Sequence, residues 1–302
     1  MPKTLIIVLG PTGVGKTSLS IGIAEHYATE IISCDSRQIY SEMSIGTAIP
    51  DENTLKKIKH HFIHSHSIFD YYNASKYEFE VLDKLDILFN KHDVVLMVGG
   101  SMLYIDAVCK GIDDLPEVDP ELRRSLIERM ENYGIESLHT ELRHLDPDYY
   151  SEVDLRNPKR ILHSLEICLL TGKPYSSFRT KQHKPRNFNV IKLGLNRQRS
   201  DLYQNINFRI EKMFQKGLVE EARNLFPYRH LNALNTVGYR ELFEHFDNKI
   251  SLEAAKEKIK ANTRKYARKQ LTWFNRDSGI NWFSPPNEET ILSFLELQLN
   301  EN

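Results

Sequence analysis

A glycine-rich segment, Gly10-Pro-Thr-Gly-Val-Gly-Lys-Thr17, constrains the fold of this chain more than any other feature of its sequence. It has the spacing GxxxxGK[ST] and lies between an apolar run, Thr4–Leu9, and a segment with helical spacing of apolar residues, 16–27. Glycines at these positions let backbone N–H groups surround phosphate oxygens, and the following helix N-terminus adds partial positive charge. The pattern predicts a phosphate-binding loop in which Lys16 neutralises phosphate and Thr17 offers its hydroxyl to Mg²⁺.

Short apolar segments alternate with helical patterns around this loop. Further buried strands are predicted at 30–34, 94–98 and 190–195, and helices at 77–89 and 102–108. Buried strands that alternate with helices are typical of a parallel sheet covered by helices on both faces. The sequence therefore predicts an α/β fold with a P-loop NTPase-like parallel sheet.

The alternation stops in the middle of the chain, where the pattern becomes entirely helical. Helices are predicted at 120–133, 135–145 and 157–170. Two of them begin with a capping residue followed by proline, at Asp119-Pro120 and Asn157-Pro158. We therefore predict a P-loop α/β catalytic core formed by 1–116 and 188–302, with an inserted all-helical subdomain at 117–187.

The charges are balanced in number but segregated along the chain, whose net charge is −1. Residues 113–154 hold thirteen acids and four arginines, whereas 167–200 hold eight basic residues and no acid. Residues 256–276 hold eight basic residues and one acid. Two basic blocks indicate a polyanionic partner, although the same pattern also fits two solvated faces.

Composition excludes several other classes of protein. No run of 18 apolar residues exists, and the apolar stretch near the N-terminus, Thr4–Leu9, is too short for a secretory signal. Cys34, Cys109 and Cys168 are far apart and form no CxxC pair, so neither a disulfide framework nor a zinc cluster is indicated. We expect a cytoplasmic monomer with no membrane partner.

A P-loop alone indicates phosphate binding and leaves the reaction open. The strand at 94–98 ends in Gly99-Gly100-Ser101 rather than in the acid that usually holds Mg²⁺ in P-loop NTPases. Asp35 lies instead at the carboxyl end of the second strand, on the same edge of the sheet as the P-loop. A carboxylate there can take a proton from a nucleophile, although a capping or turn role for Asp35 also fits its position.

These residues resemble the tRNA dimethylallyltransferases, also called tRNA isopentenyltransferases. The matching blocks follow the order of that family along most of the chain. They are Gly10–Thr17, Asp35–Tyr40, Met43–Ala48, His60-His61, Val98–Tyr104, Asn157–Ile161 with Leu165-Glu166, Val237–Tyr239 and Thr263–Trp273.

The resemblance implies transfer of a dimethylallyl group from dimethylallyl diphosphate to N6 of adenosine 37, next to the tRNA anticodon, with release of diphosphate. It implies that Asp35 is the general base and that Arg209 binds the diphosphate, with Mg²⁺ on Thr17. Ser101 replaces a family threonine whose hydroxyl binds the target base. The implied diphosphate-binding residues are Gly10, Pro11, Thr12, Gly13, Val14, Gly15, Lys16 and Thr17.

The same resemblance implies contacts with the tRNA anticodon stem-loop, from which the adenine must swing out to reach Asp35. His163 stands where the family usually has arginine. The implied contacts are Asp35, Ser36, Arg37, Gln38, Ser101, Arg123, Lys159, Arg160, Ile161, Leu162, His163, Asn235, Thr236, Val237, Gly238, Tyr239 and Arg240.

Three other functions remain open. An adenylate isopentenyltransferase would prenylate free AMP, ADP or ATP with the same P-loop and Asp35. A small-molecule kinase would bind ATP at the P-loop, and a non-catalytic RNA-binding protein would bind tRNA without turnover. The helical insertion and the basic segment 256–276 favour a tRNA acceptor.

Overall fold

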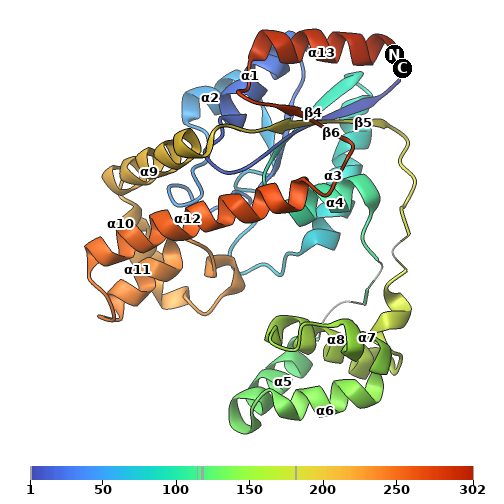
Figure 1. Ribbon diagram of the computed structural model, residues 1–302, viewed down its shortest axis with the longest axis vertical. Coiled ribbons are helices and arrows are strands. Elements are labelled where there is room, and N and C mark those ends of the chain that lie inside the picture. The colour runs from blue at the N-terminus through green and yellow to red at the C-terminus, as the bar shows by residue number, and fades with distance from the viewer. Residues whose placement is uncertain (1, 114, 117–118, 181, 302) are drawn as a thin grey trace. The chain divides into compact units, whose positions relative to one another are not determined.

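The computed structural model describes residues 2–113, 115–116, 119–180 and 182–301. The chain forms two compact units (Figure 1): an α/β unit, Met1–Cys109 with Pro185–Asn302, and a helical unit, Lys110–Lys184. Glu117, where the predicted insertion begins, lies outside the described residues.

Within the described residues, one six-stranded sheet forms the centre of the α/β unit, in the order β3-β2-β4-β1-β5-β6. Every neighbouring pair of strands is parallel. The strands are β1 (Thr4–Leu9), β2 (Ile31–Cys34), β3 (His60–His61), β4 (Val94–Gly99), β5 (Asn189–Leu195) and β6 (Ile280–Phe283). The fully buried β1 lies between β4 and β5, so the loop after Leu9 leaves the sheet near its centre, level with Gly99 and Gly194.

Helices cover both faces of this sheet. Figure 1 shows α1 and α13 on one side of the sheet and α4 and α12 on the other. The helices of this unit are α1 (Lys16–His26), α2 (Glu52–Lys57), α3 (Ala74–Phe89), α4 (Met102–Lys110), α9 (Arg199–Gln215), α10 (Leu218–Leu225), α11 (Tyr239–Phe246), α12 (Leu252–Phe274) and α13 (Glu288–Glu301), with 3₁₀ turns η2 (Phe226–Tyr228) and η3 (Asn232–Leu234). The predicted fold class is confirmed, because the sheet is parallel and has helices on both faces. A parallel sheet is stable only when both of its faces are covered.

The helical unit contains α5 (Pro120–Tyr133), α6 (Glu136–Leu145), α7 (Pro147–Glu152), α8 (Pro158–Thr171) and the 3₁₀ turn η1 (Tyr175–Phe178). Asp119 and Asn157 cap α5 and α8 as their position before proline predicts, each accepting hydrogen bonds from the first turn. The helices pack around their own buried cluster, which includes Leu126, Leu138, Leu142, Tyr149, Ile161 and Leu165. None of the described helices, in either unit, is both long enough and apolar enough to cross a lipid bilayer.

A buried carboxylate, Asp146, joins two elements of the helical unit. It caps α7 by accepting the Tyr149 N–H at 3.0 Å, and it accepts the backbone N–H and the hydroxyl of Ser176 at 2.7 and 2.8 Å. Its side chain is inaccessible to solvent, so these hydrogen bonds replace the water that the carboxylate loses on folding.

We expect Asp146→Ala to lower the free energy of unfolding by about 2–4 kcal/mol, because it removes a cap and leaves the half-buried donors of Ser176 unpaired. Urea unfolding at neutral pH measures this change. The matched control is Asp148→Ala, which alters an exposed acid in the first turn of the same helix and should shift stability by less than about 0.5 kcal/mol. Equal effects of the two substitutions would contradict the role of Asp146.

Candidate active site

The loop between β1 and α1 has the backbone conformation that its glycines permit. Gly10, Gly13 and Gly15 have φ values of 145°, 82° and 107°, which side chains disfavour. A Cβ atom at Gly10 would also come within 2.6 Å of the Leu195 carbonyl oxygen. Among the described residues, no acceptor binds the backbone N–H groups of Gly13, Gly15, Lys16 or Thr17. These donors are therefore available to an anion at the N-terminus of α1.

Lys16 folds back over this loop. Its Nζ donates hydrogen bonds of 2.9 Å to the carbonyl oxygens of Gly10 and Pro11. Burial and the nearby Arg209 lower the pKa of Lys16 to about 8, while the charge of Asp35 opposes this shift. The site thus holds a cation that has given up water and that an incoming anion would stabilise.

Arg209, on α9, brings a second cation to the same place. Burial lowers its pKa, and Asp35 again acts in the opposite direction. Lys16, Asp35 and Arg209 come from the start of α1, the end of β2 and the middle of α9, so only the folded chain brings them together. Two cations beside one carboxylate can bind a polyanion while a base stays available next to it.

The turn after β2 places Asp35 beside Ser101. Asp35 Oδ1 accepts the Arg37 backbone N–H at 2.9 Å, which fixes the direction of the carboxylate. Ser101 N–H donates to the Cys34 carbonyl at 3.2 Å, and Ser101 Oγ accepts the Ser36 N–H at 2.8 Å. The two predicted groups therefore share one edge of the sheet, because β2 and β4 are neighbouring parallel strands.

Arg37 and Gln38 use their side chains to hold neighbouring loops. Arg37 Nη1 donates to the carbonyl oxygens of residues 232–233 at 3.3 and 3.1 Å. The Gln38 amide donates to the carbonyl oxygens of residues 47–48 at 3.2 and 3.3 Å and accepts from the Ser33 hydroxyl. Arg37 thus links the Asp35 turn to the segment that precedes the predicted contact stretch 235–240.

Within that stretch, exposure differs from residue to residue. Asn235 and Arg240 are exposed and Thr236 and Val237 are half-buried, whereas Gly238 and Tyr239 are buried. The Tyr239 hydroxyl donates to Glu221 Oε1 at 2.6 Å. The buried tyrosine therefore supports the turn, and contacts with a partner fall to its neighbours.

The stretch 159–163, on α8 of the helical unit, also contains both exposed and buried residues. Lys159 and Arg160 are exposed and His163 is half-buried. Ile161 is fully buried and Leu162 is 8% exposed, both within the hydrophobic cluster of that unit. A helix buries one face, so only the polar residues of this stretch present their side chains to a partner.

Arg123, also in the helical unit, forms an ion pair with Glu166, whose side chain is 1% exposed. The guanidinium binds both carboxylate oxygens, Nη2 to Oε2 at 2.7 Å and Nε to Oε1. His163 Nδ1 lies 3.7 Å from Glu166 Oε2. Arg123 therefore compensates a buried negative charge, a structural role that the sequence did not reveal.

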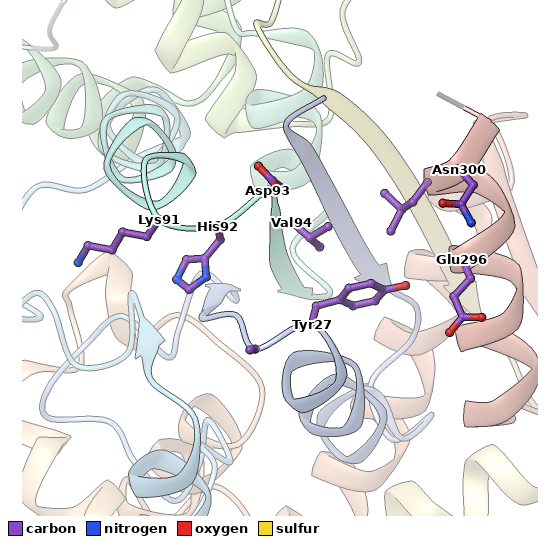
Figure 2. Close-up of a pocket in the computed structure, with 9 residues that line it drawn as sticks. Tyr27, Lys91, His92, Asp93, Val94, Glu296 and Asn300 are labelled. Carbon is purple, nitrogen blue, oxygen red and sulfur yellow. The ribbon is translucent and has the colours of Figure 1, made fainter. Parts of the chain in front are cut away.

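Two of the cavities lined by the described residues lie in the α/β unit. One of about 410 Å³ lies at the amino end of β4, between Tyr27, Val94 and Glu296 (Figure 2), away from the edge where ligands of parallel sheets bind. The other, of about 440 Å³, is lined by the segment 44–52 and by α9, including Arg209. Of the two, only the second includes a residue of the charged cluster.

Gln270, on α12, is a further residue of this edge. It is 2% exposed, and its amide hydrogen-bonds to both the P-loop and the turn before Ser101. The sequence placed it in a family-like block, Thr263–Trp273, but a glutamine in a basic helix carries no signal of its position. Spacing alone does not tell which residue of a helix faces the site.

Comparisons with known proteins show the family to which this chain belongs. The IPP transferase family model matches residues 38–277. This chain belongs to the IPP transferase family. It is 54% identical over 295 residues to tRNA dimethylallyltransferase 1 of Phocaeicola vulgatus, covering 98% of each chain, and 53% identical to that of Bacteroides fragilis, covering 98% of this chain and 99% of the relative.

Solved structures support the same family fold. The tRNA isopentenylpyrophosphate transferase of Bacillus halodurans aligns with a TM-score of 0.71 at 28% identity, covering 99% of this chain and 96% of that chain. A eukaryotic dimethylallyltransferase aligns with a TM-score of 0.80 at 24% identity, covering 94% and 74%, which supports the fold alone. The family resemblance seen in the sequence is confirmed.

The burial of Lys16 predicts a pH-dependent stability. At pH 7 we expect Lys16→Met to raise the free energy of unfolding by up to about 3 kcal/mol, because it removes a desolvated ammonium. The folded-state pKa of about 8 lies below the 10.5 of an unperturbed lysine, so wild-type stability rises with pH between these values. The advantage of the variant should therefore shrink over that window.

Urea unfolding at pH 7 and pH 10 measures this difference, because effects of other titrating groups cancel between the two proteins. Lys265→Met, at an exposed lysine of α12, is the control and should show no such pH dependence. A constant difference between Lys16→Met and wild type across pH 7–10 would contradict the lowered pKa.

Proposed function

We propose that this chain transfers a dimethylallyl group from dimethylallyl diphosphate to N6 of adenosine 37 of tRNA and releases diphosphate. The observation that carries the proposal is the grouping of Lys16 and Arg209 beside Asp35, at the edge of the sheet where the P-loop also lies. Two cations suit a departing diphosphate, and the carboxylate suits an amine that must lose a proton.

The relatives favour tRNA over the other acceptors. Chains that are 54% and 53% identical to this one over nearly its whole length are named tRNA dimethylallyltransferases. An adenylate isopentenyltransferase and a kinase would use the same P-loop but would not need a separate helical unit with exposed cations such as Lys159 and Arg160. We therefore assign tRNA as acceptor and dimethylallyl diphosphate as donor.

The donor binds through the P-loop in this proposal. The free N–H groups of Gly13, Gly15 and Lys16 bind the diphosphate oxygens, and the Lys16 and Arg209 side chains neutralise their charge. As the bond between carbon 1 and the diphosphate oxygen breaks, negative charge grows on the leaving group. These donors are already oriented, so they stabilise that charge without rearrangement.

Mg²⁺ fits the same loop. The Thr17 hydroxyl is exposed, and no hydrogen bond from it to the described protein is formed, so it is available as a hard oxygen ligand. Thr17 would hold the ion together with diphosphate oxygens and water. When bound, Mg²⁺ supplies charge neutralisation to the leaving diphosphate.

Asp35 acts as the general base on the acceptor. Its Oδ1 is held by the Arg37 N–H, and among the described residues no donor binds Oδ2, which can therefore accept a proton from N6. The N6–carbon bond forms as the carbon–oxygen bond breaks, and the N6 proton moves to Asp35. Ser101 Oγ accepts from Ser36, so its own hydrogen remains available to a ring nitrogen of the flipped adenine.

Contacts with the anticodon stem-loop involve both units in this proposal. The exposed Lys159, Arg160 and Arg240 are the strongest candidates for phosphate contacts. His163 makes a weaker contact than the family arginine, because it is half-buried and its ring lies beside the Glu166 carboxylate. The supporting observation is that these side chains are polar and accessible, unlike Ile161, Leu162 and Tyr239.

The decisive experiment combines the purified protein with unmodified tRNA, Mg²⁺ and radiolabelled dimethylallyl diphosphate, followed by nucleoside digestion. We expect label in N6-dimethylallyladenosine, and none when AMP replaces tRNA. Label on AMP would favour the adenylate alternative. Absence of any five-carbon adduct would refute the proposed transfer.

Asp35→Asn should lower kcat by about 10²–10⁴, because the amide cannot take the N6 proton. The dissociation constant for tRNA should stay within about threefold, measured by filter binding. Asp86→Asn is the control, since Asp86 is an exposed acid of α3 that lines neither cavity, and its loss should leave kcat unchanged. A kcat of Asp35→Asn near that of wild type would remove Asp35 as the base.

A substitution of Arg123 changes protein stability as well as any contact with RNA, so the experiment must separate these two effects. Arg123→Ala should destabilise the protein by about 3 kcal/mol, because the buried Glu166 loses its partner. The double substitution Arg123→Met/Glu166→Met removes both charges and should restore stability without restoring tRNA affinity. Recovery of wild-type affinity and salt dependence in the double variant would show that Arg123 does not contact RNA.

A further inference from the structure

Gln270 is a buried amide at the junction of two neighbouring strand ends. Its Oε1 accepts the Thr12 backbone N–H of the P-loop at 2.9 Å, and its Nε2 donates to the Gly100 carbonyl at 2.9 Å. The side chain is 2% exposed. One carboxamide thus uses both of its polar atoms to join the loop after β1 to the turn after β4.

Close packing leaves this amide no freedom. A Cβ atom placed on Gly100 would overlap with Gln270 Nε2 and would lie 3.3 Å from the Gly10 carbonyl oxygen. Gly100 does not have a positive φ value, so its backbone conformation does not itself require glycine. Glycine is needed at position 100 because the Gln270 amide occupies the space of a side chain.

In the proposed reaction, the two backbone segments that Gln270 joins face different substrates. Thr12 lies in the loop that receives the diphosphate, and Gly100 precedes Ser101. Ser101 in turn holds the Asp35 turn through the Ser36 N–H and the Cys34 carbonyl. The connection therefore runs from the donor loop through Gln270 to the residues that face the acceptor amine.

The rest of α12 fixes where Gln270 lies. Arg264 Nη1 donates to Asn207 Oδ1 of α9 at 2.7 Å, and Trp273 Nε1 donates to Asp106 Oδ2 of α4 at 2.8 Å. The helix is thus attached on one side of Gln270 to the helix that carries Arg209 and on the other side to the helix that follows Ser101.

We infer that Gln270 is a positioning residue that sets the distance between the diphosphate-binding loop and the Asp35–Ser101 turn. The inference rests on the proposed transfer reaction. Carbon 1 of the donor must lie in line between its leaving oxygen and the attacking N6, and a displacement of about 1 Å can cost about 10²-fold in rate. Gln270 touches neither substrate in this assignment and acts through the backbone at Thr12 and Gly100.

The test is steady-state kinetics of Gln270→Met, whose side chain has similar length but cannot replace the two hydrogen bonds. We expect kcat to fall about 10–100-fold, while KM for tRNA and for dimethylallyl diphosphate stays within about threefold. A rise in either KM with unchanged kcat would assign Gln270 to binding and overturn the inference. A kcat within twofold of wild type would also overturn it.

Loss of stability alone is controlled by Thr29→Val. Thr29 is also buried, at 6% exposed, and its hydroxyl donates one hydrogen bond of 2.6 Å to the Val94 carbonyl, at the amino end of the strands. The Thr29→Val substitution should lower the melting temperature and leave kcat unchanged. A comparable fall of kcat in Thr29→Val would mean that any destabilisation slows the enzyme, and the inference would fail.

Gly100→Ala tests the same contact from its other side and serves if Gln270→Met fails to fold. The added methyl displaces the Gln270 amide, so kcat should fall as in Gln270→Met. The double variant should be no slower than Gln270→Met, because both substitutions break one connection and the flexible methionine can yield to the methyl. Additive losses would show that the two residues act independently.

The same assay separates failure of the inference from failure of the proposed function. Wild-type protein that forms no prenylated nucleoside would remove the reaction itself. Active wild-type protein together with fully active Gln270→Met and Gly100→Ala would leave the reaction standing and refute only the role of Gln270.

Discussion

Lys16 and Arg209 lie beside a single carboxylate, Asp35, at the carboxyl edge of the sheet. Burial disfavours both cations, and Asp35 compensates only part of that cost. A bound polyanion would offset the rest of that cost. The pairing of β1 with β4 and β5 fixes where the glycine loop begins, and the positive φ values of its glycines let it turn into α1.

The acceptor side depends on the same edge through different contacts. Ser101 binds the backbone on both sides of Asp35, and Arg37 binds the carbonyl groups of residues 232–233. Gln270 then connects this turn to the P-loop. Most of these contacts are side chain to backbone, so they position loops rather than supply charge. A transfer reaction between two bound substrates needs this kind of alignment, since both must be held in one geometry.

The helical unit shows how family resemblance and structure complement each other. The family resemblance implied that Arg123 and the stretch Lys159–His163 contact tRNA. The structure shows that some of these side chains are exposed and others are buried. Ile161 and Leu162 belong to the hydrophobic cluster, and Arg123 compensates the buried Glu166. The capping pairs before α5 and α8 were predictable because Asp or Asn before proline is a strong helix start. The strand β6 and the helix α13 were not predicted, because a four-residue strand after a long helix gives too little periodicity.

The sequence by itself determined the P-loop, the parallel α/β class and the candidate base Asp35, because these depend on local spacing: glycines before a helix, apolar runs of strand length, and an acid directly after a strand. Only the tertiary structure decided that Arg209 and Gln270 reach this edge, that Tyr239 is a buried support, and that Gly100 is glycine because an amide 170 residues away fills its side-chain space. Contacts between distant segments are set by how helices pack on the sheet, and that packing leaves no signal in the spacing of residues along one helix.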